Sequence, residues 1–322
     1  MATAEQIKSL IRTHRTDDPE RFYSIALQVA AHEAKQGHTA LAHDIRDIVD
    51  KSRKAKGAVV LRFPTDMLGL VLSEKSGIAK SALVITTALE KRIARIIHEY
   101  RQQHKLKSHG LTNRRKVLLI GPPGTGKTMT AKVLAHELSL PLHTIQVDRL
   151  VTKFMGETSA KLRQIFELIQ NEVGVYLFDE FDAIGGERSL ENDVGEMRRV
   201  LNAFLQFIEH DSSDSLVVAV TNSPKLLDRA LFRRFDDVMY YEQPTDDERK
   251  HLIENVLGTY LALHFAWKQV IDNSRDLSHA EIDQACRDAI KNTILSGKTK
   301  VKATELLCTL KERKDVHSSL RK

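Results

Sequence analysis

The chain has 322 residues, of which 42% are hydrophobic, 29% charged and 6% aromatic, and its formal net charge is +6. This length suits about two domains, and the composition is typical of a helix-rich soluble protein. Membrane association is not expected, because no apolar run approaches the ~18 residues of a spanning helix and the N-terminus lacks the apolar core of a signal peptide. Two cysteines, Cys286 and Cys308, give no disulfide framework, so we expect a cytoplasmic location.

The positive charge is concentrated in one segment. Residues 85–116 contain nine Lys and Arg against two acidic residues, Glu90 and Glu99, which leaves a local surplus of +7. A basic helix followed by a basic linker could face nucleic-acid phosphates, a neighbouring subunit or only water. The charge alone leaves these three interpretations open.

The first ~55 residues predict a small helical domain. Asp18 and Pro19 form an N-cap and first-turn pair, and apolar residues then recur at helical spacing up to Val29. A second apolar stripe covers residues 41–49. We expect residues 1–55 to be a docking domain of two or three short helices, and residues 56–84 to hold a linker and the start of the next module.

Residues 85–243 alternate between apolar runs and helix-period stripes, a pattern that predicts an α/β domain with a parallel sheet of five strands. The strand candidates are residues 117–120, 142–147, 174–178, 216–220 and 237–241. After Pro244 the pattern contains helices only. We therefore assign residues 244–322 to a small α-helical domain.

A phosphate-binding motif follows the first of these strands. The stretch GPPGTGKT fits G-x-x-x-x-G-K-[ST] in the required strand–loop–helix context. Glycines let the backbone wrap a phosphate, Lys127 is placed to neutralise the β- and γ-phosphates, and the Thr128 hydroxyl to ligate Mg²⁺. The residues predicted to bind ATP are Gly121, Pro122, Pro123, Gly124, Thr125, Gly126, Lys127, Thr128 and Met129.

A second catalytic signal is the stretch VYLFDEFDAI. An apolar strand that ends in Asp179 and Glu180 brings two carboxylates to the sheet edge where ligands of open α/β sheets bind. We expect Asp179 to hold the Mg²⁺ shell, usually through water, and Glu180 to polarise the attacking water. Together with the lysine loop, these residues predict an ATP-hydrolysing P-loop enzyme.

With these motifs in place, residues 60–315 resemble the AAA ATPases. In VVAVTNSPKLLDRALFRRFD, Asn222 matches the family's sensor-1 residue, which reads the γ-phosphate. Arg233 and Arg234 match the paired arginines that reach a neighbouring subunit's nucleotide, and the pair without an intervening Pro-Gly is closer to the katanin, spastin and Vps4-type branch. The resemblance implies a homo-oligomeric ring, with six subunits as the family expectation.

Further stretches match the family in part. TKFMGET resembles the pore loop that grips an extended polypeptide, which implies this role for Lys153, Phe154, Met155 and Gly156. Residues 185–193 are the expected second pore loop. DLSHAEIDQACRDA aligns with the sensor-2 region, but His279 stands where glycine is usual, and no arginine is obvious for a sensor-2 role.

The resemblance implies a ring ATPase that remodels, unfolds or threads a protein client. The chain has no motif of a zinc protease, serine hydrolase or cysteine protease. Its N-terminal region and compact core also resemble bacterial ATPases encoded beside a subtilisin-type serine protease in operons for defence against phage or plasmids. An ATP-dependent switch or scaffold and a nucleic-acid-directed ATPase are the alternatives.

Overall fold

The computed structural model describes residues 69–150, 155–181, 193–223 and 232–320, and separate positions between 26 and 46. The chain divides into two compact units, residues 1–64 and 65–322. In the first unit the described positions that are buried are Ala26, Val29, Ala30, Glu33 and Ala42, all of them helical. Most of the predicted docking domain lies outside the described residues, so its role stays a prediction.

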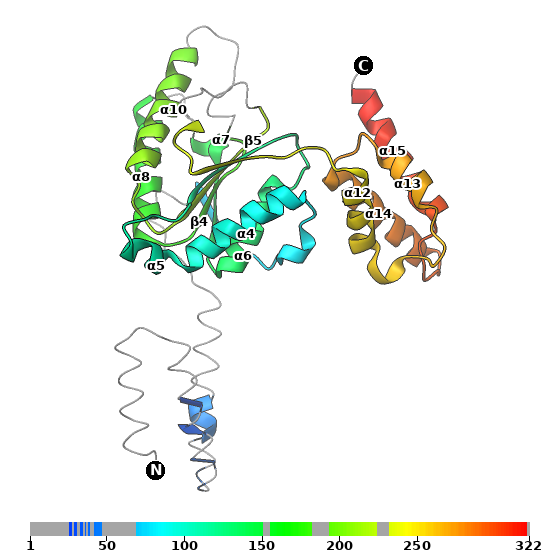
Figure 1. The fold of residues 1–322 in the computed structure, drawn as a ribbon, viewed down its shortest axis with the longest axis horizontal. Helices are drawn as coiled ribbons and strands as arrows, with labels where there is room; N and C mark the ends of the chain where they lie inside the picture. Colours follow the sequence, from blue (N-terminus) through cyan, green and yellow to red (C-terminus); the bar gives the residue numbers. More distant parts are fainter. Residues whose placement is uncertain are drawn as a thin grey trace. The chain divides into compact units, whose positions relative to one another are not determined.

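The second unit consists of a sheet covered by helices and a C-terminal group of helices (Figure 1). The strands are β1 (Val71–Glu74), β2 (Lys116–Ile120), β3 (Leu142–Ile145), β4 (Val175–Phe178), β5 (Leu216–Thr221) and β6 (Asp237–Tyr240). The helices between them are η2 (Lys80–Ala82), α4 (Thr87–Arg101), α5 (Gln103–Ser108), α6 (Lys127–Leu138), α7 (Val147–Leu150), α8 (Met155–Asn171) and α10 (Asp193–His210). The C-terminal helices are α12 (Asp246–Leu257), η4 (Gly258–Tyr260), α13 (Trp267–Ser274), α14 (His279–Leu295) and α15 (Ala303–Leu320).

The sheet confirms the predicted α/β class and corrects its strand count. The strand order is β1-β3-β4-β5-β2-β6, and β2 to β6 form a parallel sheet as predicted. A sixth strand, β1, pairs antiparallel with β3, so that Val71 lies opposite Ile145. The sequence predicts only a linker and the start of the next module for this region, because a four-residue edge strand with one buried side chain carries almost no periodic signal.

Helices cover both faces of the sheet. On one face, α4 and α6 pack against alternate strand residues such as Val117 and Leu119. On the other face, the rings of Phe166 in α8 and Phe204 in α10 lie 6.2 and 5.1 Å from the ring of Phe178 in β4. Burial on both faces explains why the central strands are continuous apolar runs without alternation.

The C-terminal helices form a separate hydrophobic core. Its buried residues come from α12, α13, α14 and α15, and Val84 joins them from the segment before α4. Two of these helices begin with a capping box, formed by Thr245 and Glu248 in α12 and by Ser278 and Glu281 in α14. Reciprocal capping fixes where each helix starts, which matters for α14 because its first turn reaches the functional site.

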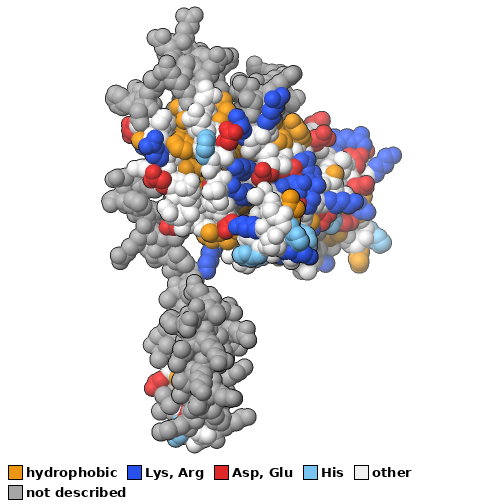
Figure 2. All heavy atoms as spheres, turned by 60° about the vertical axis from the view of Figure 1, so that its left-hand side comes forward, with side chains coloured by type: hydrophobic (Ala, Val, Ile, Leu, Met, Phe, Trp, Pro, Cys, Tyr) orange, Lys and Arg blue, Asp and Glu red, His pale blue; other side chains and the backbone are white. Residues whose placement is uncertain are grey.

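The basic segment is folded into the α/β part instead of being a linker. It forms α4 and α5, and six of its nine cations make ion pairs with carboxylates. The pairs are Arg92 and Arg95 with Asp237, Arg101 with Glu137, Lys107 with Asp214, Arg114 with Glu99, and Arg115 with Asp211. Figure 2 shows acidic and basic side chains interspersed over the described surface. In the described part of the chain, no helix is long and apolar enough to cross a bilayer.

His143 is a buried titratable residue in β3. Its side chain is 0% exposed, its Nδ1 lies 2.7 Å from Ser73 Oγ, and its ring stacks on Tyr176 at 4.6 Å. Burial lowers the pKa of His143 from 6.5 to about 4. The folded protein therefore keeps this imidazole neutral in a pH range where the unfolded chain would protonate it.

We predict that His143 makes the protein less stable to unfolding in mild acid. Between pH 6.5 and about 4 the unfolded state binds more protons at this residue, so the free energy of unfolding falls as the pH is lowered through that window. The shift corresponds to a loss of up to about 3 kcal/mol. Urea unfolding of wild type and His143→Phe at pH 7 and pH 4.5 should show a weaker pH dependence in the variant. Replacement of the exposed His104 by Gln is the control and should leave the pH dependence unchanged.

Candidate nucleotide site

The loop of residues 121–126 connects β2 directly to α6. Gly124 and Gly126 have φ values of +74° and +95°, which side chains with a Cβ rarely adopt. A Cβ on Gly121 would lie 2.3 Å from the Tyr241 carbonyl oxygen, so glycine is also required there by close packing. The loop can therefore turn sharply and present the N-terminus of α6, with its backbone N–H groups, to an anion.

Lys127 begins α6 and folds back over this loop. Its side chain is nearly buried, and Nζ donates hydrogen bonds to the carbonyl oxygens of Gly121 at 2.8 Å and Pro122 at 2.6 Å. Thr125 Oγ1 donates to the same Pro122 carbonyl at 2.8 Å. The ammonium group is thus held by backbone oxygens at the mouth of the loop, within a site suited to phosphate oxygens.

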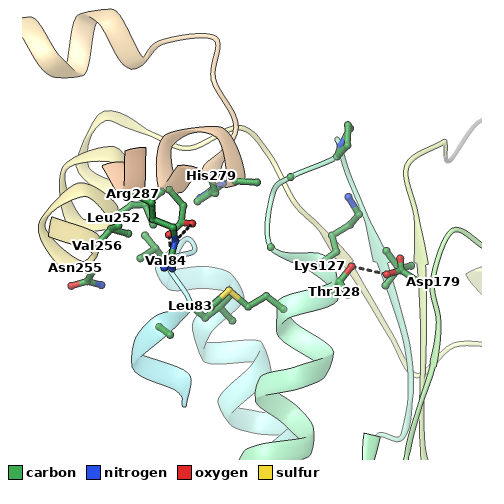
Figure 3. Close-up of a pocket in the computed structure, with 18 of the residues that line it drawn as sticks. Leu83, Val84, Lys127, Thr128, Asp179, Leu252, Asn255, Val256, His279 and Arg287 are labelled. Carbon is green, nitrogen blue, oxygen red and sulfur yellow. Dashed lines mark hydrogen bonds and ion pairs between the residues drawn. The ribbon is translucent and has the colours of Figure 1, made fainter. Parts of the chain in front are cut away.

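Thr128 and Asp179 meet beside the loop. Thr128 Oγ1 donates a hydrogen bond of 2.8 Å to Asp179 Oδ2, and Asp179 Oδ1 accepts from the backbone N–H of Glu180 at 3.0 Å (Figure 3). A hydroxyl and a carboxylate are hard oxygen donors of the kind Mg²⁺ prefers. Among the described residues, no group of three or more His, Cys, Asp or Glu side chains could hold a metal. This donor set fits Mg²⁺, which is commonly held by one or two protein groups, with phosphates and water completing the shell.

Glu180 is held in an unusual backbone conformation at the end of β4. Its φ is +52°, in the left-handed region, while the next residue, Phe181, is fully buried and donates its N–H to Val220 O at 2.8 Å. Such a conformation costs of order 1–3 kcal/mol and persists where the surroundings enforce it. The anchored neighbours place the exposed Glu180 side chain in the wall of the cavity described next.

One cavity of about 680 Å³ brings the predicted catalytic residues together. Lys127, Thr128, Asp179, Glu180 and Asn222 line it at the carboxyl ends of β2, β4 and β5. Pro123, Gly124, Gly126 and Met129 also line it, whereas Gly121, Pro122 and Thr125 support the loop without facing the cavity. The volume lies within the range of pockets for small molecules.

Apart from His279, which the sequence places in the sensor-2 region, the rest of the cavity is lined by residues that the sequence did not single out. Leu83 and Val84 precede α4, while Leu252, Asn255 and Val256 belong to α12. From α14 come His279, Asp283 and Arg287, which are spaced four residues apart and therefore share one helix face. No arginine had been obvious for this region, although the spacing from His279 would have indicated Arg287. Arg287 Nε donates to Asp283 Oδ2 at 2.7 Å.

The C-terminal helices contact the phosphate loop directly. The backbone N–H of Ala280, in the first turn of α14, donates a 3.0 Å hydrogen bond to the carbonyl oxygen of Gly124. A Cβ on Gly124 would lie 2.6 Å from Ser278 Oγ and 3.2 Å from the Ala280 Cβ. Gly124 is therefore required twice, by its own backbone conformation and by the close approach of α14.

Other predicted site residues lie outside the cavity. Arg233 and Arg234 are exposed on the turn before β6, and Arg234 pairs with Glu209. Lys153, Phe154 and most of the expected second pore loop lie outside the described residues. We had expected the first pore loop to include Met155 and Gly156, but α8 begins at Met155, so both residues lie in its first turn.

Comparisons with known proteins identify the family of this chain. The family model described as "ATPase family associated with various cellular activities (AAA)" matches residues 117–243. The relative y4kL of Sinorhizobium fredii, described as an uncharacterized AAA family ATPase, is 31% identical over 314 residues, which cover 94% of this chain and 92% of that protein. A putative 26S proteasome regulatory subunit homolog of Methanothermobacter thermautotrophicus is 34% identical over 62% of this chain and 55% of its own length. The peroxisomal ATPase pex6 of Schizosaccharomyces pombe is 35% identical over 59% of this chain and 21% of its own length.

The chain belongs to the AAA family of ATPases. It is an enzyme that hydrolyses ATP to ADP and phosphate, and AAA ATPases generally bind ATP together with Mg²⁺.

We predict that Gly124→Ala will weaken nucleotide binding far more than a matched glycine substitution elsewhere. Gly110 also has a positive φ, +72°, but a Cβ there would meet nothing within 4 Å. Gly110→Ala should therefore cost only the backbone strain of about 1–2 kcal/mol. Gly124→Ala adds the clash with Ser278, so the Kd for ADP, measured by calorimetry, should rise tenfold or more in this variant alone. Equal affinities of the two variants for ADP would show that the close contact between Gly124 and Ser278 does not matter for nucleotide binding.

Proposed function

We propose that ATP binds in the cavity with its triphosphate over the loop of residues 121–126 and is hydrolysed there. One observation carries this proposal: Lys127, the Thr128–Asp179 pair, Glu180 and Asn222 line the same 680 Å³ cavity. These side chains supply a cation, a metal-binding pair, a base and a polar sensor. Hydrolysis of a phosphoanhydride requires this combination.

Lys127 neutralises the β- and γ-phosphates after exchanging its bonds to the loop carbonyls for phosphate oxygens. Thr128 and Asp179 hold Mg²⁺, which neutralises charge on the phosphates when bound. Their present 2.8 Å hydrogen bond keeps both oxygens at one place beside the loop. The loop amides and the α6 N-terminus supply further positive potential at fixed positions.

Glu180 polarises the water that attacks the γ-phosphate, and Asn222 helps to place this water. Glu180 follows β4 and Asn222 follows β5, which is the neighbouring strand, so both side chains reach the cavity from the same sheet edge. The strained backbone of Glu180 supports this role, since such strain is commonly retained at functional positions.

We predict that Glu180→Gln will separate binding from hydrolysis. The amide keeps the shape of the side chain but cannot accept a proton, so the ATP turnover rate should fall by roughly 10²–10⁴-fold. The Kd for ATP, measured by calorimetry, should stay within about threefold of wild type, since Glu180 contacts the water and not the phosphates. Glu167→Gln on the exposed face of α8 is the control and should hydrolyse ATP at the wild-type rate. Undiminished turnover in Glu180→Gln would remove Glu180 from the mechanism.

Arg233 and Arg234 act on the nucleotide of a neighbouring subunit in this proposal. Both are exposed and absent from the wall of their own chain's cavity, which supports a contribution in trans. Arginines supplied in this way stabilise the charge that grows on the phosphoryl oxygens. Hydrolysis would then depend on a homo-oligomeric ring, with six subunits expected for this family.

The ring's work is remodelling or threading of a protein client, to which Phe154 and its neighbours in the pore loop would bind. AAA family members typically form rings and act on proteins, and the relatives include a proteasome regulatory subunit homolog. A separately encoded subtilisin-type serine protease, in defence against phage or plasmids, is a partner suggested only by the resemblance of the N-terminal region together with the compact core. The nucleic-acid alternative loses support because most cations of residues 85–116 are already paired with carboxylates.

We predict that Phe154→Ala will retain basal ATP turnover but lose its response to a polypeptide. If the pore grips extended chains by apolar contact, an unstructured polypeptide should change the ATPase rate of wild type and of Phe154→Tyr, which retains an aromatic ring. Phe154→Ala should not respond in the same phosphate-release assay. A normal response of Phe154→Ala would contradict threading and favour the switch or scaffold alternative.

A further inference from the structure

His279 occupies a distinctive place in the cavity wall. It is the first residue of α14, directly after the N-cap Ser278, and its side chain lines the cavity. Both ring nitrogens are shielded from solvent, and neither has a hydrogen-bond partner among the described residues. Buried polar atoms in native proteins are nearly always paired. Since His279 borders the cavity, a molecule bound there is the nearest candidate partner for this ring.

The charged residues near His279 are already engaged elsewhere. Glu248 Oε2 accepts hydrogen bonds from the Thr245 backbone N–H at 2.8 Å and hydroxyl at 2.9 Å. Arg249 donates to Asp246 Oδ1 at 3.1 Å and to the Ser274 carbonyl oxygen at 3.3 Å. Both residues belong to α12, which packs on α14. Neither of them satisfies the imidazole.

The ring is neutral near pH 7. Burial lowers the pKa of His279 below its usual value, Glu248 opposes this effect, and Arg249 reinforces it. A neutral imidazole offers one N–H donor and one nitrogen acceptor. Such a group complements hydroxyls and heterocyclic nitrogens better than phosphates, which in this cavity already face Lys127 and the loop.

The position of the ring also points to the nucleoside. Ala280, the next residue, bonds to Gly124 O, so α14 begins against the phosphate loop. Asp283 and Arg287 follow on the same helix face, and Figure 3 draws Arg287 on the same side of the cavity as the apolar Leu252 and Val256. His279 thus stands where the wall changes from the phosphate end to the apolar end.

We propose that the His279 ring hydrogen-bonds to the nucleoside part of the bound nucleotide and thereby ties the C-terminal helices to an occupied site. This inference rests on the proposed position of ATP in the cavity. The ring acts as a positioning and specificity-determining residue. A ribose hydroxyl and a base nitrogen share the required chemistry, and the experiment below distinguishes them.

The experiment measures the Kd of ADP by calorimetry for wild type, His279→Ala and His279→Gln. ADP avoids complications from hydrolysis. Loss of one net hydrogen bond should raise the Kd of His279→Ala about fivefold to tenfold. His279→Gln, which keeps a donor and an acceptor, should recover part of the affinity. His264→Ala, on the exposed loop before α13, is the matched control and should bind like wild type.

Analogues identify the contacted group. Wild type should bind one of 2′-deoxy-ADP, 3′-deoxy-ADP or inosine diphosphate more weakly than ADP, and His279→Ala should lose that discrimination. If His279→Ala no longer discriminates against a deoxy analogue, the ring contacts a ribose hydroxyl. If it no longer discriminates against inosine diphosphate, the ring contacts the base. Equal binding of all four nucleotides by wild type would overturn the proposal even if His279→Ala did not fold.

Three results would contradict the proposal at different levels. If His279→Ala lowers the melting temperature of the nucleotide-free protein but keeps the wild-type Kd, the ring only fills space and the proposal is wrong. If wild-type protein does not bind ADP at all, the proposed nucleotide site itself fails, and the inference fails with it. Binding by wild type with unchanged binding by His279→Ala rejects only the role of His279.

Discussion

Parallel pairing of β4, β5 and β2 is the constraint on which the rest of the molecule depends. The register sets Ile120 beside Thr221 and Phe178 beside Ala219, so the carboxyl ends of these strands reach one sheet edge. Every predicted catalytic side chain that lines the cavity follows one of these ends within a few residues. Because a shift of one residue would turn each strand's side chains to the opposite face, the apolar packing on both faces also fixes the chemistry at the edge.

A second joint connects this edge to the C-terminal helices. Ala280 bonds to the Gly124 carbonyl, and Val84 belongs to the core of the C-terminal helices although it precedes α4. Movement of the phosphate loop therefore acts on the start of α14 through backbone contacts. If nucleotide binds as proposed, these contacts would couple its binding to the position of the C-terminal helices.

Electrostatics in this chain serve folding as much as binding. Asp211 is buried and pairs with Arg115, while the buried Asp237 pairs with Arg92 and Arg95. Removing one partner of such a pair would leave an uncompensated buried charge. Asp211 lies 96 residues after Arg115 and Asp237 lies 145 residues after Arg92, so part of the local surplus is neutralised only in the folded chain.

The sequence alone predicted the P-loop class, the five parallel strands and, as site residues, Lys127, Thr128, Asp179, Glu180 and Asn222, because each prediction depends on local spacing and on a place after an apolar run. Tertiary structure alone decided the edge strand β1, the pairing of the basic segment and the part of the cavity wall that comes from the C-terminal helices. These features arise from contacts between residues far apart in sequence, and Val84 and Leu252 carry no local signal of a common site. His279 is an example of both contributions. The sequence shows a histidine where glycine is usual, but only the folded structure shows that both ring nitrogens are buried without a hydrogen-bond partner among the described residues.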